Sequence, residues 1–120
     1  MNKKMPSEIP PSYEIPAETL EKLRRIFSKD VSQEASIFKA LSDPLRLKIL
    51  RVLKEESVCV CVLIELSNIQ YSALSYHLKL LRDANLIDFR KKGKFLIYSL
   101  TDFGRKIVEI IDELKTNSSC

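Results

Sequence analysis

The stretch from residue 71 to residue 100 constrains the fold most, because a two-faced helical pattern is followed at once by two alternating segments. Leucines recur there at helical spacing and predict one apolar stripe, namely Leu74, Leu78 and Leu81. The opposite side carries hydroxyl groups, an aromatic ring and a base, namely Ser72, Ser75, Tyr76 and Lys79. Such a helix packs with one face and offers hydrogen-bonding groups with the other.

The segment 86–100 predicts a β-hairpin with a charged tip. Apolar and polar residues alternate on each side of a basic turn, Lys91-Lys92-Gly93-Lys94. From residue 71 to residue 106 there are eight Lys and Arg residues against three Asp and Glu residues, an excess larger than the net charge of +4 of the whole chain. A polyanion such as nucleic acid is the natural partner of this part of the chain.

Helical patterns precede and follow this stretch. The sharpest start signal is Asp43-Pro44, because Asp is a favoured N-cap and Pro a favoured first helical residue. The expected helices lie within residues 16–30, 32–43, 44–56, 60–67 and 103–115. Together with residues 71–84, which we call the reader helix, they predict a mainly α protein.

We expect one folded domain, residues 17–115, with two short extensions. Residues 1–16 hold four of the five prolines and predict a flexible arm, and residues 116–120 predict a polar tail. No apolar run reaches the roughly 18 residues that a membrane span needs, and the first residues lack the apolar stretch of a signal peptide. A cytoplasmic protein without a membrane partner is therefore expected, with its three cysteines reduced.

The order of elements predicts a winged helix-turn-helix with a small β-hairpin wing. In that arrangement the second helix of the pair enters the major groove, here the reader helix, and the wing tip, residues 90–94, contacts phosphates. The first and last helices have apolar faces without an obvious partner in the chain, which predicts a homodimer formed through them. The expected partner is a pseudo-palindromic operator in double-stranded DNA.

Three motifs, FKALSDPLRLKILRVLKEE, YSALSYHLKLLRDANLI and KKGKFLIYSLT, give residues 34–102 a continuous resemblance to the ArsR/SmtB family of winged-helix metalloregulatory repressors. The resemblance is strongest to the arsenic-responsive branch, which carries Leu-Cys-Val-Cys-Asp-Leu-Cys where this chain has VCVCVLI at residues 58–64. It implies a homodimeric repressor, without an organic cofactor, that leaves its operator on binding As(III), Sb(III) or another thiophilic ion.

The resemblance also implies site residues. DNA contacts fall to the reader helix and the wing, namely Tyr71, Ser72, Ser75, Tyr76, Lys79, Arg90, Lys91, Lys92 and Lys94. Metal ligands fall to the cysteines, namely Cys59, Cys61 and Cys120. Val62 replaces the acid of the motif and Ile64 its third thiol. Either Cys120, from its own chain or from the partner, completes a three-sulfur site, or two thiolates bind the ion with an exogenous ligand.

Two other metal sites of the family are not expected. The zinc site of the last helix uses histidine, which residues 103–115 do not contain. A cadmium or lead site recruits cysteines of the arm, and residues 1–58 contain none.

The spacing of Cys59 and Cys61, the cysteine pair, predicts a switch. In a regular helix, side chains at i and i+2 point about 200° apart, so both sulfurs bind one ion only if the backbone distorts. We expect distortion of residues 58–63 to tilt a helix packed directly against the reader helix, and so to weaken DNA binding.

Other interpretations stay open at this point. The cysteine pair also fits a redox switch, or small buried side chains in a constitutive regulator. The fold also fits an interaction module that does not bind DNA. An enzyme is not expected, because no spacing places His77, the only histidine, beside a cysteine with an orienting group; His77 is expected to pack or to face phosphate. Gln70 occupies the cap position of the reader helix, where Ser or Thr is usual.

Overall fold

The computed structural model describes residues 14–118, and their side chains up to residue 115. The chain divides into two units, residues 1–31 and 32–120. The first contains α2 (Ala17–Phe27), the helix expected after the proline-rich arm. Its side chains stay largely exposed, with Phe27 92% exposed. Most of the expected arm, residues 1–13, lies outside the described residues.

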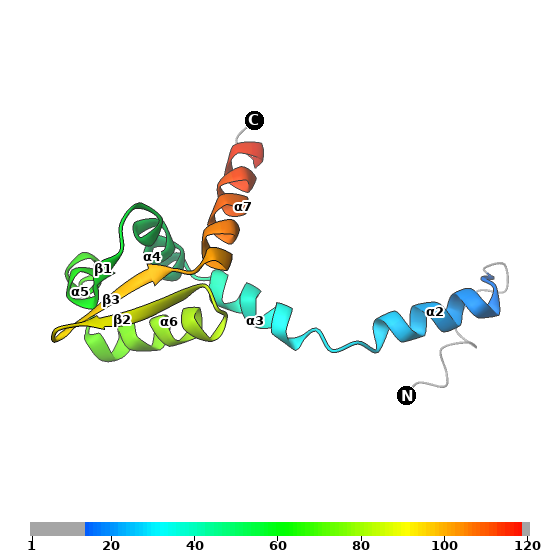
Figure 1. Ribbon diagram of the computed structural model, residues 1–120. Helices are drawn as coiled ribbons and strands as arrows, with labels where there is room; N and C mark the ends of the chain where they lie inside the picture. The colour runs from blue at the N-terminus through cyan, green and yellow to red at the C-terminus, as the bar shows by residue number, and fades with distance from the viewer. Residues whose placement is uncertain (1–13, 119–120) are drawn as a thin grey trace. The chain divides into compact units, whose positions relative to one another are not determined.

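The second unit follows the expected order of helices and hairpin (Figure 1). Its helices are α3 (Ser32–Leu41), α4 (Pro44–Glu55), α5 (Val60–Ser67), α6 (Tyr71–Asp83) and α7 (Asp102–Ser118). Its strands are β1 (Val58–Cys59), β2 (Ile87–Lys92) and β3 (Phe95–Leu100). Figure 1 shows α6 running beside β2 and α5 beside β1, at opposite edges of the sheet. The mainly α fold with a small β wing is confirmed.

The strand β1 was not expected, and it turns the hairpin into a three-stranded antiparallel sheet in the order β1-β3-β2. It pairs Val58 with Tyr98 and Cys59 with Ile97. Two residues are too few to carry an alternating pattern, which is why the sequence does not reveal this strand. Gly93, with φ of +63°, supplies the left-handed residue of the turn between β2 and β3.

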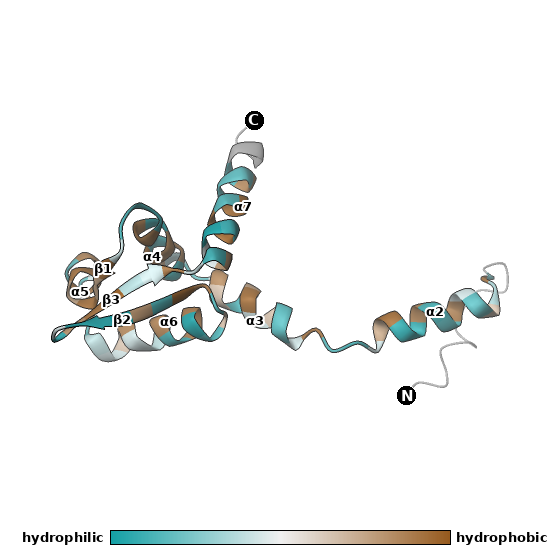
Figure 2. Ribbon diagram, viewed as in Figure 1, coloured by the Kyte–Doolittle hydropathy of each residue, from teal (hydrophilic) through white to brown (hydrophobic). Residues whose placement is uncertain are grey.

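The core forms where α3 to α7 meet the sheet, and it is built mostly from leucine. Its largest fully buried members are Leu50, Leu53, Leu63, Leu74, Leu78, Leu81, Leu86 and Ile87. The predicted stripe of the reader helix is therefore buried. Figure 2 shows apolar and polar residues alternating along α7, as expected of an amphipathic helix. Within residues 14–118, no helix is both long and apolar enough to cross a membrane.

The inward face of α3 differs from the one expected. The apolar residues Ile37, Phe38 and Leu41 of the sequence predict a face that includes Phe38, but this ring is 70% exposed and Ala40 is buried instead. The helical phase explains the difference, because Ile37, Ala40 and Leu41 follow an i, i+3, i+4 pattern that leaves Phe38 outside it. An exposed phenylalanine thus lies on α3.

Capping groups fix the helix ends, in part as expected. The Asp43 carboxylate accepts the backbone N–H of Arg46 at 3.1 Å, which confirms the predicted N-cap of α4. For α6, the side chain of Gln70 makes no capping hydrogen bond to the described residues, so the expected weak cap is also observed. Past α6, Asn85 adopts φ of +62° and the N–H of Leu86 bonds to the carbonyl of Leu81, which closes a Schellman motif.

The start of α7 is held against the segment that follows α6. Thr101 rather than Asp102 provides the cap, because its Oγ1 accepts the N–H of Gly104 at 2.8 Å and donates to the carbonyl of Asn85 at 2.7 Å. A Cβ at Gly104 would overlap the backbone carbonyl of Leu86. Only glycine allows this close approach of helix to loop.

Candidate nucleic-acid interface and cysteine pair

The outer face of α6 is exposed. Tyr71, Ser72, Tyr76 and Lys79 are exposed, and Ser75 is half-buried. The Ser75 hydroxyl donates to the carbonyl of Ser72 at 3.1 Å, and the Lys79 ammonium lies 2.8 Å from the Asp83 carboxylate. The tyrosines and hydroxyls therefore face solvent, whereas Asp83 partly offsets the charge of Lys79.

The wing tip concentrates exposed bases at one end of the sheet. Arg90, Lys91 and Lys92 end β2, and Lys94 follows Gly93 in the turn. All four side chains are exposed, and so is the neighbouring Phe95. Such a cluster suits contacts with phosphates, which position a protein on DNA without reading its sequence.

The wing is joined to α6 through stacked side chains. The Arg82 guanidinium of α6 lies 4.5 Å from the centroid of the Phe89 ring of β2. The Phe89 ring in turn lies 5.3 Å from the ring of Tyr98 in β3, its cross-strand partner. The two groups of residues expected to contact DNA thus belong to elements in direct contact.

The cysteine pair lies at the junction of β1 and α5. Cys59 is the last residue of β1 and the N-cap of α5, with φ of −65° and ψ of 148°. Cys61 lies in the first turn of α5, and its N–H donates to the Cys59 sulfur at 3.3 Å. The helix begins at Val60, as expected, so Cys59 precedes it and the regular-helix geometry applied to the cysteine pair is wrong. Since extended backbone brings the two side chains together at the helix start, the divergence of about 200° does not apply.

The two thiols differ in acidity. The pKa of Cys59 is lowered, first by the hydrogen bond from the Cys61 side chain and then by the N–H groups of Cys61 and Val62. The pKa of Cys61 is raised, first by that same hydrogen bond to Cys59. Cys59 is therefore the more acidic of the two thiols, and thiolates are the form that binds soft ions and reacts with electrophiles.

Within the described part of the chain, no third metal ligand lies near the cysteine pair. Among the residues described, no group of three or more His, Cys, Asp and Glu side chains is arranged to hold a metal ion. Cys120, the expected third ligand, lies outside the described residues. The described residues thus offer two thiols as metal ligands, the half-buried Cys59 and the exposed Cys61. Two thiols suit a thiophilic ion and leave a coordination position for a further ligand.

Contacts of α5 differ from those expected. This helix makes its most extensive contacts with β1 and β3, while α6 packs mainly on α3, α4 and β2. The expected tilting of one helix directly against the other is therefore not the main connection. Instead, β1 ties the cysteine pair to the central strand of the wing, and the Ser99 hydroxyl adds a bond of 2.7 Å to the Ser57 hydroxyl.

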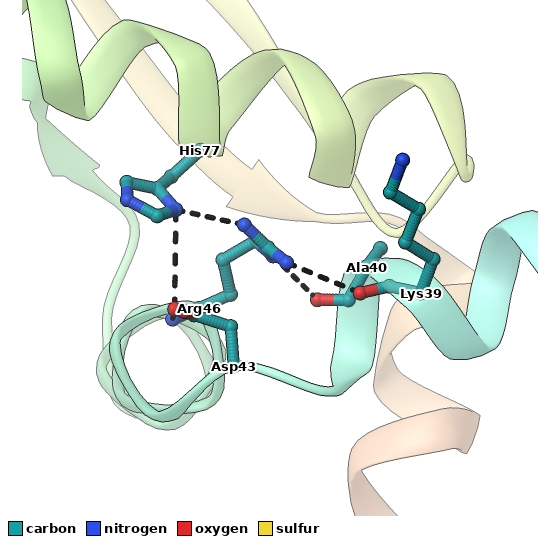
Figure 3. Close-up of polar contacts among 5 residues, drawn as sticks. All are labelled: Lys39, Ala40, Asp43, Arg46 and His77. Atoms are coloured by element: carbon teal, nitrogen blue, oxygen red, sulfur yellow. Dashed lines mark hydrogen bonds and ion pairs between the residues drawn. The ribbon is translucent and has the colours of Figure 1, made fainter.

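A polar cluster beneath α6 was missed (Figure 3). Arg46 is 7% exposed and contacts His77 of α6, with 2.9 Å between Nη1 and Nδ1. The Asp43 carboxylate lies 3.9 Å from the same ring nitrogen. Packing, one of the two roles expected for His77, is what the described structure shows. The sequence did hold a signal, because Arg46 precedes Ile49 and Leu53 at i+3 and i+7 on the inward face of α4.

Comparisons with known proteins agree with this arrangement. Residues 43–88, from the cap of α4 into β2, match the family model described as bacterial regulatory protein, arsR family. The transcriptional repressor SmtB homolog of Synechocystis sp. is 35% identical over 97 residues, which cover 77% of this chain and 74% of that protein. The chain belongs to the ArsR family.

A second sequence relative and one solved structure also resemble this chain. The arsenical resistance operon repressor of Bacillus subtilis is 48% identical over 66 residues, which cover 54% of this chain and 63% of that protein. A homodimeric winged helix-turn-helix DNA-binding domain from Mycobacterium bovis, described as a possible ArsR-family transcriptional regulator, superposes with a TM-score of 0.66 at 18% identity. The superposition covers 85% of this chain and 88% of that domain, and this similarity supports the winged-helix fold.

ArsR-family proteins are transcriptional regulators that bind DNA, and the relatives named above are regulators rather than enzymes. The predicted family and the predicted non-enzymatic role are thereby confirmed.

Proposed function

We propose that this ArsR-family protein is a repressor that leaves its DNA operator when a thiophilic ion, As(III) or Sb(III), binds the cysteine pair. The observation that carries the proposal is the position of Cys59. It ends a strand that is paired with the wing, it caps α5, and its thiolate is favoured by Cys61. An ion that binds both sulfurs therefore acts on the strand and on the helix at once.

The proposed DNA-binding mode uses α6 and the wing tip. The reader helix enters the major groove, where its tyrosines and hydroxyls contact base edges, and the bases of the wing tip contact phosphates. Support comes from the exposure of these side chains and from the Arg82–Phe89–Tyr98 stack that joins the two elements.

We propose a homodimer with a two-fold axis, so that two reader helices contact half-sites about 34 Å apart. Both α2 and α7 carry exposed apolar side chains, among them Ile26 and Phe27 on α2 and Ile110 and Leu114 on α7. Large apolar side chains of this kind favour association. The Mycobacterium bovis domain is described as homodimeric, in line with this assembly.

The ion is proposed from the donor set. Thiolates select soft ions, and the Bacillus subtilis relative is named for arsenical resistance. As(III) held by Cys59 and Cys61 needs a further ligand. Cys120 or an exogenous thiol is proposed for that place.

The coupling is proposed to run through the sheet. An ion that displaces Cys59 also displaces Val58, whose pairing partner Tyr98 contacts Phe89, and Phe89 lies under the Arg82 guanidinium of α6. The wing and the reader helix would thus change position together. A coupling free energy of about 1–3 kcal/mol is enough to change DNA affinity about 5- to 150-fold.

The test uses the full chain and a duplex that it selects from a random-sequence library. Fluorescence anisotropy then measures binding with arsenite, cadmium, zinc or peroxide added in turn. We expect arsenite to weaken binding by the wild type but not by Cys59→Ser or Cys61→Ser, and Ser67→Ala on α5 serves as the matched control. The absence of duplex binding in about 50 mM salt, where phosphate contacts are strong, or equal release of wild type and cysteine variants, would contradict the proposal.

A redox response is the second candidate, because the thiolate character of Cys59 also favours oxidation. Release by peroxide alone would replace the ion-sensing proposal with this one. If none of the added ions and no peroxide weakens DNA binding, the protein is a constitutive regulator and its cysteines are structural.

A further inference from the structure

We propose that Arg46 is a positioning residue for DNA reading, which fixes the orientation of the reader helix α6 through His77. The inference rests on the proposed function, because it assumes that α6 contacts DNA. No DNA contact is assigned to Arg46 itself, since it is buried on the inward face of α4.

The guanidinium of Arg46 joins three helices. Its Nε donates to the carbonyl of Ala40 at 2.8 Å and its Nη2 to the carbonyl of Lys39 at 3.1 Å, both in the last turn of α3. Its Nη1 lies 2.9 Å from Nδ1 of His77 on α6. Every nitrogen of the guanidinium thus has a partner, and Figure 3 shows the side chain reaching from α4 between the other two helices.

This geometry fixes the hydrogen-bonding state of His77. A guanidinium has five N–H donors and no acceptor, so Nδ1 of His77 must accept, and the ring proton belongs on Nε2. The carbonyls at the end of α3 carry the negative end of that helix dipole and hold the guanidinium in place. Lysine cannot reproduce the arrangement, because its single nitrogen does not span three separate partners.

His77 connects this cluster to the outer face of α6. Its ring stands edge to face with Tyr76, with 5.7 Å between ring centroids, and Tyr76 is 54% exposed among the proposed base contacts. The next residue, Leu78, is buried in the core. The rotation of α6 about its axis, and with it the direction of the Tyr76 ring, is therefore set by one polar contact and one apolar stripe. Loss of the polar contact leaves α6 folded but less well aligned with the groove.

The test compares Arg46→Lys and His77→Phe with the wild type, in full-length chains. His77→Phe removes the acceptor but keeps a ring beside Tyr76 and leaves both carbonyl contacts of Arg46 in place, so it serves if Arg46→Lys does not fold. Arg51→Lys is the matched control, because it makes the same change on the exposed side of α4. The probes are the duplex selected by the wild type and a scrambled duplex.

We expect both variants to lose about tenfold in affinity for the selected duplex, within the usual range of coupling effects, with unchanged affinity for the scrambled one. The salt dependence of binding stays as in the wild type, because no phosphate contact is removed. In ¹⁵N NMR spectra, we expect His77 of the wild type to show the Nε2–H tautomer and Arg46→Lys to lose it.

Equal loss on both duplexes, a lower salt dependence, or selected-duplex binding like that of Arg51→Lys would overturn the inference. Failure of the wild type to bind any duplex would instead overturn the proposed function. The two failures are therefore distinguishable.

Discussion

The sulfur of Cys59 lies 3.3 Å from the backbone nitrogen of Cys61 and accepts its hydrogen bond at the start of α5. The cysteine pair is thus already preorganised without an ion, with one thiol favoured as the anion and the other as its donor.

We expect Cys59 to be alkylated faster than Cys61 at neutral pH. The lowered pKa of Cys59 gives it more thiolate below the ordinary thiol value of about 8.5, and the raised pKa of Cys61 gives it less. Iodoacetamide rates against pH, followed by mass spectrometry in a Cys120→Ser background, measure both midpoints. In Cys61→Ala the Cys59 midpoint rises, because its thiol donor is lost. Faster reaction of Cys61 would contradict this assignment.

Phe89→Leu should weaken the coupling between ion and DNA. The substitution removes the ring that lies under Arg82 and against Tyr98, so displacement of β1 reaches α6 less directly. A reduction of the coupling free energy by about 0.5–2 kcal/mol is expected. DNA affinity with and without arsenite gives that quantity. Phe103→Leu makes the same change on α7 at a ring that is not part of this stack, and it should leave the coupling free energy unchanged. An equal effect of both variants would argue against the proposed route.

Gly104→Ala should destabilise the protein, although alanine is usually the better helix former by about 1 kcal/mol. The new methyl group would overlap the carbonyl of Leu86, so helix or loop must shift. A loss of about 1–3 kcal/mol in the free energy of unfolding is expected. Urea denaturation measures it, with the exposed Arg105→Ala on the same helix as control. A gain in stability would show that α7 does not approach the loop so closely.

Gln70→Ser should stabilise α6. Gln70 has extended backbone suited to an N-cap but no capping side-chain bond to the described residues, whereas serine supplies an oxygen for the N–H groups of the first turn. We expect a gain of about 0.5–1 kcal/mol in the free energy of unfolding. Gln70→Ala, which adds no acceptor, should show no such gain in the same denaturation experiment.

Much of this architecture was predictable because it depends on local patterns. Residues close in the sequence are enough to predict three features: the buried stripe of α6, the helix start at Asp43-Pro44 and the alternating hairpin. The three motifs within residues 34–102 similarly identified the family that the comparisons show.

The unpredicted features depend on residues distant in the sequence. β1 forms because Val58 and Cys59 pair with β3, some forty residues later in the chain. Two residues are too few to show the alternation of apolar and polar residues that predicts a strand. The partners of Arg46 lie in other helices, among them His77 of α6. From the sequence alone, this buried arginine therefore cannot be told from an exposed base.

The most direct test of the central claim is the affinity of arsenite for the free protein and for its complex with the selected duplex. If ion binding at the cysteine pair and DNA binding by α6 are coupled, linkage requires arsenite to bind the complex more weakly by the same factor by which it weakens DNA binding, about 5- to 150-fold. Equal arsenite affinities in the two states would contradict the account.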